Sequence, residues 1–143
     1  MTDKPRPNLW WSILTMKCPR CRRGHMFKDQ NSFRKLKLSH IFDMYDTCPV
    51  CRQKYDMETG FWYGTGYVSY GLAVMVSALT FIAWLLLIGV STEDSRIFWW
   101  LGVNALILVT TQPWLMRISR VIYIYFFVQY DKNYEVTEPQ KFD

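Results

Sequence analysis

Four cysteines, arranged as two Cys-Pro-x-Cys pairs, are the residues of this sequence best suited to chemistry. Cys18 and Cys21 form the first pair, Cys48 and Cys51 form the second, and the chain has no other cysteine. A two-residue spacing lets one turn present two sulfurs to a single ion, and four thiolates complete a tetrahedral shell. The pattern predicts a four-cysteine metal site. Zinc is the expected ion, and iron stays open because it accepts the same four sulfurs.

Other uses of paired cysteines fit this sequence less well. A haem attachment site needs His directly after the second Cys, where Arg22 and Arg52 stand. A thioredoxin-like redox pair expects a βαβ context and needs only one copy. Structural disulfides need an oxidising compartment, whereas the charge pattern places this segment in the cytoplasm. His25 and His40, the only histidines, are surplus to a four-sulfur shell.

The distribution of charge along the chain predicts helices that cross a membrane. Residues 59–92 and 97–116 contain no Asp, Glu, Lys or Arg. Within them we expect spanning helices at residues 66–90 and 97–116, because about 20 apolar residues cross a hydrocarbon core. The link between them is short, so the helices must form an antiparallel hairpin. Buried helices of a large soluble core would also be uncharged, but a chain this short has nothing left to bury them with.

The positions of Lys and Arg predict the orientation of this hairpin. Twelve of the seventeen Lys and Arg occur at or before Lys54, whereas the loop between the two helices holds only Arg96. Because cytoplasmic segments carry the excess of these residues, both termini are expected in the cytoplasm. Trp84, Trp99 and Trp100 suit the aromatic belt at the opposite interface.

The expected fold class is a membrane α-helical hairpin of two transmembrane helices with a small N-terminal cytoplasmic zinc-ribbon-like domain. Between the cysteine pairs, Leu36 and Leu38 alternate with Lys35 and Lys37, as in a half-buried strand. The expected segments are an interfacial amphipathic segment (1–16), the four-cysteine zinc-ribbon-like domain (17–58), a junction with the first transmembrane helix (59–92), a short extracytoplasmic loop (93–96), the second transmembrane helix continuing into an interfacial helix (97–130) and a polar cytoplasmic tail (131–143).

Small, aromatic and polar residues on the two helices predict faces for helix packing or for a partner. Small residues let helices approach closely, and polar side chains are costly against lipid. We expect the polar groups to pair with the tyrosines or with a partner. The candidate packing and partner residues are Gly60, Gly64, Gly71, Tyr63, Tyr67, Tyr70, Asn104 and Gln112.

The basic residues predict contact with lipid. Arg117 and Arg120 follow the second apolar stretch and are expected to reach lipid headgroups. The basic residues of the ribbon would be attracted to the anionic cytoplasmic leaflet in the same way. Nucleic acid is not an expected partner, because the ribbon lacks the interleaved aromatic platform on which single strands stack.

Two motifs carry a family resemblance that covers most of the chain. The stretches CPRCRRGHMF and CPVCRQKYDMETGFWYGTGYVSYGL, followed by a second span ending in a basic residue, resemble the bacterial membrane-protein family catalogued as domain of unknown function 983. The FWYG and YVSY junction resembles its Bacteroidetes branch. Members often have Gly where Arg22 and Arg52 stand here. The resemblance implies a bacterial inner-membrane protein without an established activity, and some relatives are similar to proteins encoded among respiratory oxidase assembly factors.

These observations lead to two hypotheses about function. The first is a non-enzymatic inner-membrane adaptor or accessory subunit, in which a zinc ribbon and a hairpin dock to a larger membrane protein or to further copies of the chain. The alternative is a metal-handling or thiol-redox assembly factor, for example for a respiratory oxidase. An enzyme is not expected, because Asp56 and Glu58 are the only paired acids near the membrane and no nucleophile and base accompany them.

Overall fold

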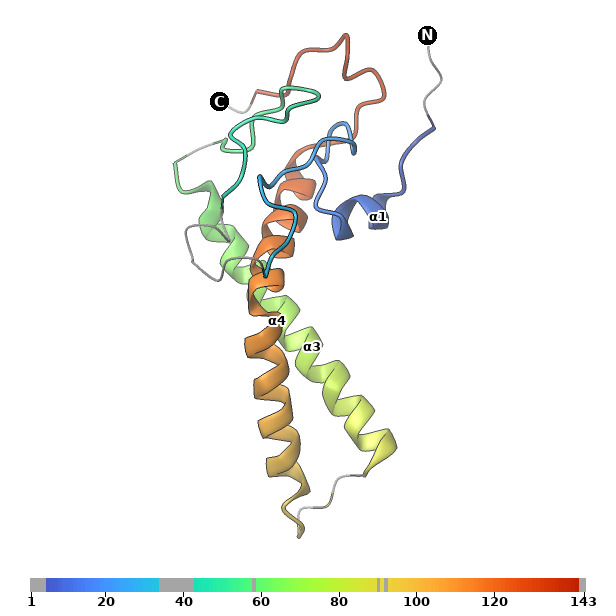
Figure 1. Ribbon diagram of the computed structural model, residues 1–143, viewed down its shortest axis with the longest axis vertical. Helices are drawn as coiled ribbons and strands as arrows, with labels where there is room; N and C mark the ends of the chain where they lie inside the picture. Colours follow the sequence, from blue (N-terminus) through green and yellow to red (C-terminus); the bar gives the residue numbers. More distant parts are fainter. Residues whose placement is uncertain (1–4, 34–42, 58, 90, 92, 142–143) are drawn as a thin grey trace.

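The protein consists of a long helical hairpin that carries a small, loop-rich head at one end (Figure 1). The computed structural model describes residues 5–33, 43–57, 59–89, 91 and 93–141. Its helices are α1 (Leu9–Leu14), the 3-10 turn η1 (Phe61–Tyr63), α3 (Gly64–Leu87) and α4 (Arg96–Phe127). The two ends of the described chain both lie in the head, while the loop that joins α3 to α4 lies at the far end. The predicted strand around Leu36 and Leu38 lies outside the described residues.

The helix α3 corresponds to the first predicted span. It begins at Gly64 rather than Gly66 and ends at Leu87, after which Gly89 adopts a φ of 77° and breaks the helix. At 1.5 Å per residue its 24 residues extend about 36 Å. The stretch Phe61–Leu87, including η1, is long and apolar enough to cross a membrane, and within the described chain it alone meets both criteria.

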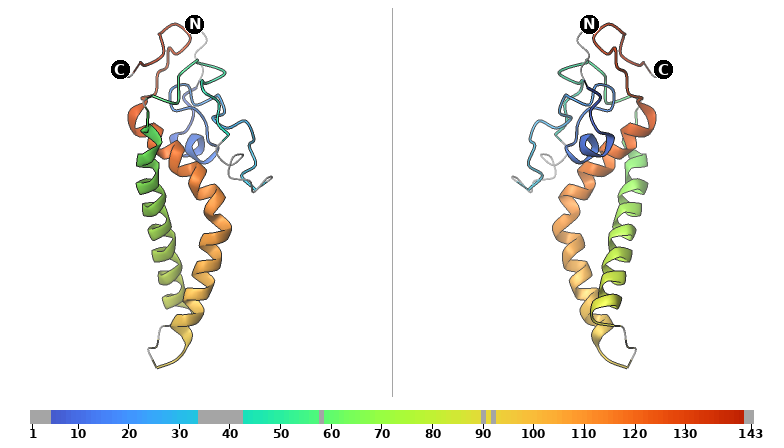
Figure 2. Two further views of the ribbon diagram at one scale, coloured as in Figure 1. Left: turned by 90° about the vertical axis from the view of Figure 1, so that its left-hand side faces the viewer. Right: turned by 90° about the vertical axis from the view of Figure 1, so that its right-hand side faces the viewer.

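The helix α4 covers the second predicted span and then continues without a break to Phe127. Pro113 lies inside it, and Thr110 and Thr111 donate their hydroxyl protons to carbonyls one turn earlier, including that of Ile107. Because each hydroxyl is hydrogen-bonded within the helix, these threonines expose no unpaired hydroxyl proton on this part of α4. Figure 2 shows α4 bowed along its length, as expected for a helix with an internal proline.

A polar contact joins α3 and α4 in the middle of the hairpin. The Asn104 amide donates to the Ser77 hydroxyl at 3.2 Å, and its carbonyl accepts a hydrogen bond from Thr80 at 3.0 Å. Asn104 therefore takes part in helix packing, as expected, but its partners on α3 are Ser77 and Thr80 and not a tyrosine. The physical reason is register, because the antiparallel packing brings Ser77 and Thr80 opposite this turn of α4 and satisfies the buried amide.

The last turns of α4 form part of the core of the head. Val121, Ile124 and Val128 are fully buried against Met26 and Tyr55 of the ribbon. We expected this segment to continue as an interfacial helix, and its position relative to a membrane remains a prediction. Its apolar positions recur every three or four residues and face the ribbon. A small ribbon buries too little apolar surface to fold alone. The end of α4 supplies the missing surface.

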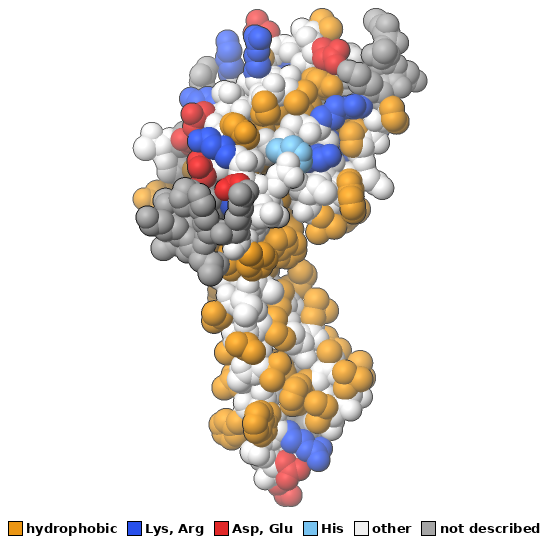
Figure 3. Space-filling view, viewed as in Figure 1, with side chains coloured by type: hydrophobic (Ala, Val, Ile, Leu, Met, Phe, Trp, Pro, Cys, Tyr) orange, Lys and Arg blue, Asp and Glu red, His pale blue; other side chains and the backbone are white. Residues whose placement is uncertain are grey.

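Charged side chains lie at the two ends of the molecule. Figure 3 shows them gathered over the head and again at the loop between the helices, while hydrophobic side chains cover the hairpin between these ends. Most of the apolar side chains of α3 are exposed, among them Val74, Leu79, Ile82 and Leu86. Such a large exposed apolar belt marks a surface that is covered by lipid or by protein.

Glycines at the start of α3 have distinct structural roles. Gly60 precedes the helix and adopts a φ of 89°, so it turns the chain into η1 rather than packing against a helix. Gly64 packs directly against the ring of Tyr123 on α4, where a Cβ atom would overlap it. Gly66 and Gly71 have open space around them.

The close contact at Gly64 generates the first prediction. Gly64→Ala should destabilise the hairpin by about 1–3 kcal/mol, because the added methyl group must displace the Tyr123 ring. Reversible unfolding of the full chain in detergent measures the effect. Gly66→Ala is the matched control, since its methyl group would meet no atom within 4 Å. Equal stability of both variants would contradict the packing at Gly64.

Candidate metal centre

The four cysteine sulfurs converge on one point in the head. All Sγ atoms lie within 4.8 Å of one another, with Cys18 to Cys51 at 3.6 Å and Cys21 to Cys48 at 3.7 Å. Sulfurs bound tetrahedrally at about 2.3 Å from one ion would be about 3.8 Å apart. The side chains are between 0 and 5% exposed. The cluster can therefore hold a metal ion in a closed, four-sulfur site.

The two cysteine pairs have the same backbone geometry. In each turn the amide directly after the second cysteine bonds back to the carbonyl of the first. Arg22 N–H donates to the Cys18 carbonyl at 2.8 Å, and Arg52 N–H donates to the Cys48 carbonyl at 2.9 Å. Short antiparallel bridges flank both turns, pairing Lys17 with His25 and Thr47 with Lys54. Two equivalent turns thus present two sulfurs each from opposite sides.

Arg22 and Arg52 adopt left-handed backbone conformations, with φ of 52° and 58°. These are the positions at which the resembled family often has Gly, and this conformation costs a residue with a side chain about 1–2 kcal/mol. Arg22 gains compensating contacts, since it lies 4.6 Å from the centre of the Tyr130 ring and donates to the Pro7 carbonyl. Arg52 is exposed.

Gly24 allows the first turn to approach the opposite cysteine pair. A Cβ atom at this position would lie 2.5 Å from the Cys48 sulfur and 3.3 Å from Val50. The Gly24 amide also points at the Cys21 sulfur, at an N to Sγ distance of 3.5 Å. An N–H group directed at a sulfur stabilises a thiolate there. Gly24 is thus required because a side chain would overlap the Cys48 sulfur, and not because of its φ angle.

The proximity of the sulfurs makes their protonation interdependent. Hydrogen bonds from Cys18 and then Cys21 lower the pKa of Cys48, because they stabilise its thiolate. The pKa of Cys18 is raised, first by its hydrogen bond to Cys21 and further by the other thiols and by burial. Four thiolates at these distances require a bound cation to offset their repulsion. A metal ion would release the remaining protons and be bound more weakly at low pH.

A buried tyrosine faces the sulfur cluster. Tyr55 is 1% exposed, and its hydroxyl has no hydrogen-bond partner among the described residues. Burial raises the pKa of Tyr55, and the neighbouring Cys18 and Cys48 raise it further. A neutral hydroxyl in this position can donate to a metal-bound thiolate, which would satisfy it. The unpaired hydroxyl therefore fits a metal-loaded four-cysteine centre.

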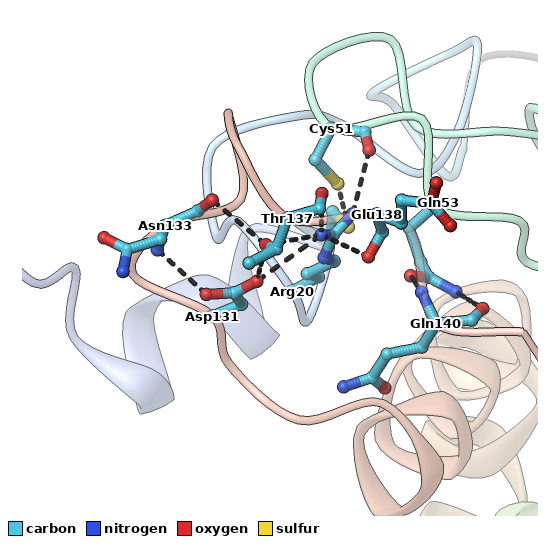
Figure 4. Close-up of polar contacts among 9 residues, drawn as sticks. Arg20, Cys51, Gln53, Asp131, Asn133, Thr137, Glu138 and Gln140 are labelled. Carbon is cyan, nitrogen blue, oxygen red and sulfur yellow. Dashed lines mark hydrogen bonds and ion pairs between the residues drawn. The ribbon is translucent and has the colours of Figure 1, made fainter.

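Arg20, the residue between Pro19 and Cys21, connects the cysteine cluster to a segment near the C-terminal end of the described chain. One of the two terminal nitrogens of the buried guanidinium donates to the Cys51 carbonyl at 3.2 Å. The other donates to the carbonyls of Thr137 and Glu138 at 2.6 and 2.8 Å and forms an ion pair with Asp131 at 3.4 Å. Arg20 therefore connects both cysteine turns to the tail (Figure 4).

Further hydrogen bonds attach the tail, which we define as residues 129–141, to the ribbon and stabilise its own fold. The side-chain amide of Gln53 donates to the Gln140 carbonyl and accepts from the Gln140 amide, both at 2.9 Å (Figure 4). Asp131 accepts from the Thr137 hydroxyl and from the Asn133 amide. The Thr137 hydroxyl, then Asn133 and Arg20, lower the pKa of Asp131. The tail is thus a folded part of the head.

The predicted partner residues lie on the hairpin, from Gly60 and η1 through α3 to α4. Tyr63, Tyr67 and Tyr70 are 86, 83 and 73% exposed. Gly71 is exposed on α3, and Gln112 is half-buried on α4. These tyrosines therefore form an exposed stripe at the head end of α3, and their role in binding a partner remains a prediction.

The two arginines assigned to lipid headgroups contact the head. Arg117 is buried, donates to the Asp29 carbonyl at 2.7 Å and lies 4.9 Å from the centre of the Phe27 ring. Arg120 lies 5.0 Å from the centre of the Trp62 ring. Burial leaves the Arg117 guanidinium little surface for a headgroup. Arg117 is therefore not available to a lipid headgroup. Arg120 is only half-buried, so its contact with a headgroup remains a prediction.

Several residues of the site were absent from the sequence-based assignment. Arg20 was counted only with the basic residues of the ribbon, and Gln53, Tyr55, Asp131 and Thr137 were given no role. The partners of Arg20 on the tail lie 111 to 118 positions away in sequence. No local periodicity connects such residues. The one usable signal was the apolar spacing of Val121, Ile124 and Val128, which indicates that a helix face is covered.

Comparison with known proteins returned no match, since no family model, no curated protein and no solved structure is significantly similar to this chain.

The strained conformation of Arg52 generates the second prediction. Arg52→Gly should stabilise the metal-bound head by up to about 1 kcal/mol, because Gly adopts the left-handed conformation without the steric cost. Thermal unfolding of the metal-loaded full chain measures the gain. Arg52→Ala removes the same exposed side chain but keeps a Cβ atom, so it is the matched control. A stabilisation of equal size in both variants would contradict the role of the backbone.

The Arg20 network generates the third prediction. Arg20→Lys should increase protease cleavage within the tail about tenfold, because Lys cannot donate simultaneously to Cys51 and to the tail, and charged hydrogen bonds contribute about 1.5–3 kcal/mol. Limited proteolysis followed by mass spectrometry measures it, with Arg23→Lys as the control. Cleavage at the wild-type rate would show that other contacts hold the tail.

Proposed function

We propose that the protein is a membrane-anchored adaptor without catalysis of its own, in which a zinc-held cytoplasmic head and a two-helix hairpin dock to a larger membrane protein. On this proposal the chain belongs to the bacterial inner-membrane family that its motifs resemble. The observation that carries the proposal is the closed, buried cluster of four cysteines, which shares a core with the end of α4.

The closure of the cluster favours a structural ion. Structural zinc sites are closed four-ligand sites, whereas catalytic sites keep one position open for water or substrate. Here all four sulfurs are buried, and Arg20, the tail and the end of α4 surround them. Zinc is the ion proposed, because it accepts this ligand set without redox chemistry. The four-thiolate set itself also suits iron.

The contact between ribbon and tail supports a hairpin with two crossings. Arg20 lies before α3 and Thr137 lies after α4, yet they are hydrogen-bonded to each other. They must therefore lie on the same side of a membrane. If α3 crosses it, the chain has to return, and α4 is the segment that provides the second crossing. The excess of Lys and Arg in the head favours the cytoplasm as that side.

The exposed tyrosine stripe that begins in η1 and continues along α3 is the proposed docking face. Tyr63, Tyr67 and Tyr70 lie close to the head, where aromatic residues with one polar atom are favoured both at membrane boundaries and in interfaces. The open space around Gly66 and Gly71 would let a partner helix approach.

Purification of the full chain from its native membrane in a mild detergent tests this function. We expect about one zinc ion per chain, resistant to chelator for hours, together with a partner in fixed stoichiometry. Cys48→Ser should lose both, since the head would no longer fold around an ion. Thr47→Ser, an adjacent and exposed substitution, is the control.

Each alternative outcome has a distinct meaning in that experiment. Rapid exchange of the metal, or a reversible disulfide between Cys18 and Cys21, would contradict the structural role and favour metal handling or thiol-redox assembly. Absorbance in the visible range would identify iron in place of zinc. A chain that holds zinc tightly but remains monomeric in every mild detergent would contradict the adaptor role.

A further inference from the structure

A cavity of about 410 Å³ opens on the head between α1, the first cysteine turn and α4. Its walls include Leu14 at the end of α1, Lys17 and His25 beside the first pair of cysteines, and Trp114 of α4. The volume lies within the range of about 300–1,000 Å³ typical of small-molecule sites. This cavity is separate from the buried sulfur cluster.

We propose that this cavity binds the phosphate-bearing headgroup of an anionic membrane lipid. The inference rests on the proposed placement of the hairpin in a membrane, but neither on the metal nor on a protein partner.

The charge of the cavity selects an anion. Lys17 and His25 are opposite each other in an antiparallel bridge, so their side chains emerge on the same face, and both line the cavity. No Asp or Glu belongs to its lining among the described residues. The neighbouring Asp29 carboxylate acts electrostatically on Arg117. A phosphate in the cavity could bind the Lys17 ammonium group and an N–H group of the His25 imidazole. No carboxylate of the lining would repel it.

The polar side chains on another wall complete a headgroup site. Gln30, Asn31 and Ser32 follow one another along this wall, and the Ser32 residue is buried. Amides and hydroxyl groups can bond to the phosphate oxygens and to the glycerol hydroxyls of a headgroup. Together with Lys17 and His25 they give the cavity a polar side.

The apolar walls favour a lipid over a free phosphate. Trp114 lies near the head end of the uncharged stretch of α4 at residues 97–116, so it marks the head end of the second proposed crossing. On α1, Trp10, Trp11 and Leu14 are 75, 63 and 53% exposed beside the cavity. Exposed tryptophans of this kind are enriched at the level of lipid headgroups. A soluble phosphate would gain nothing from these walls, whereas a lipid would extend along them.

Native mass spectrometry of the full chain tests the proposal in micelles that contain equal amounts of phosphatidylglycerol and phosphatidylcholine. The wild type should retain phosphatidylglycerol preferentially. The double substitution Lys17→Gln with His25→Gln should reduce that preference about fivefold or more, since one basic residue near a headgroup contributes about 1 kcal/mol. Lys54→Gln is the matched control, because it removes an exposed charge from the second cysteine turn, outside the cavity.

A second variant guards against misfolding of the first. Asn31→Trp would fill the cavity from an exposed position on its wall, and it should reduce the preference without removing a charge. Retained metal shows that a variant is folded. A folded variant of either kind with wild-type preference would overturn the proposal, as would an equal loss in Lys54→Gln. Displacement of the lipid by equimolar glycerol phosphate would overturn the assignment to lipid. None of these outcomes bears on the adaptor role.

Discussion

The repulsion among four buried thiolates is the constraint on which the head depends. Sulfurs within 4.8 Å of one another in a buried site can ionise together only around a cation. A bound ion would replace the apolar core that so short a ribbon lacks, and its binding free energy would become folding free energy. Val121, Ile124 and Val128 add the remaining apolar surface. One helix therefore belongs both to the hairpin and to the head, which makes the two parts a single mechanical unit.

The features that could be predicted from the sequence are those with a local signal. A two-residue spacing in each Cys-Pro-x-Cys turn fixes where two sulfurs point, so the cluster of four followed from the pattern alone. Long uncharged stretches fixed the two helices and their antiparallel arrangement in the same way. The conformation of Arg52 shows the limit of this reasoning. Residues with a side chain rarely adopt a left-handed φ, so the sequence alone does not predict it at this position.

The features that could not be predicted depend on contacts between distant segments. Asn104 was recognised as a buried polar group that needs a partner, but which residue faces it depends on the relative register of two helices. Arg117 was recognised as a cation at the end of an apolar stretch. Its guanidinium contacts the Asp29 carbonyl and the Phe27 ring, which the sequence does not indicate. The tail was predicted only as a polar segment, because no sequence pattern near residues 131–140 indicates a contact with Arg20.

The bonds from Arg20 and Gln53 to the tail also impose an order of assembly during synthesis. The cysteine turns leave the ribosome first, but the residues that cover them are made only after both helices have been translated. Until then the nascent ribbon has an uncovered flank and lacks the turns of α4 that complete its core. Closure of the head is therefore a late event, possible only after α3, α4 and the tail have all been synthesised.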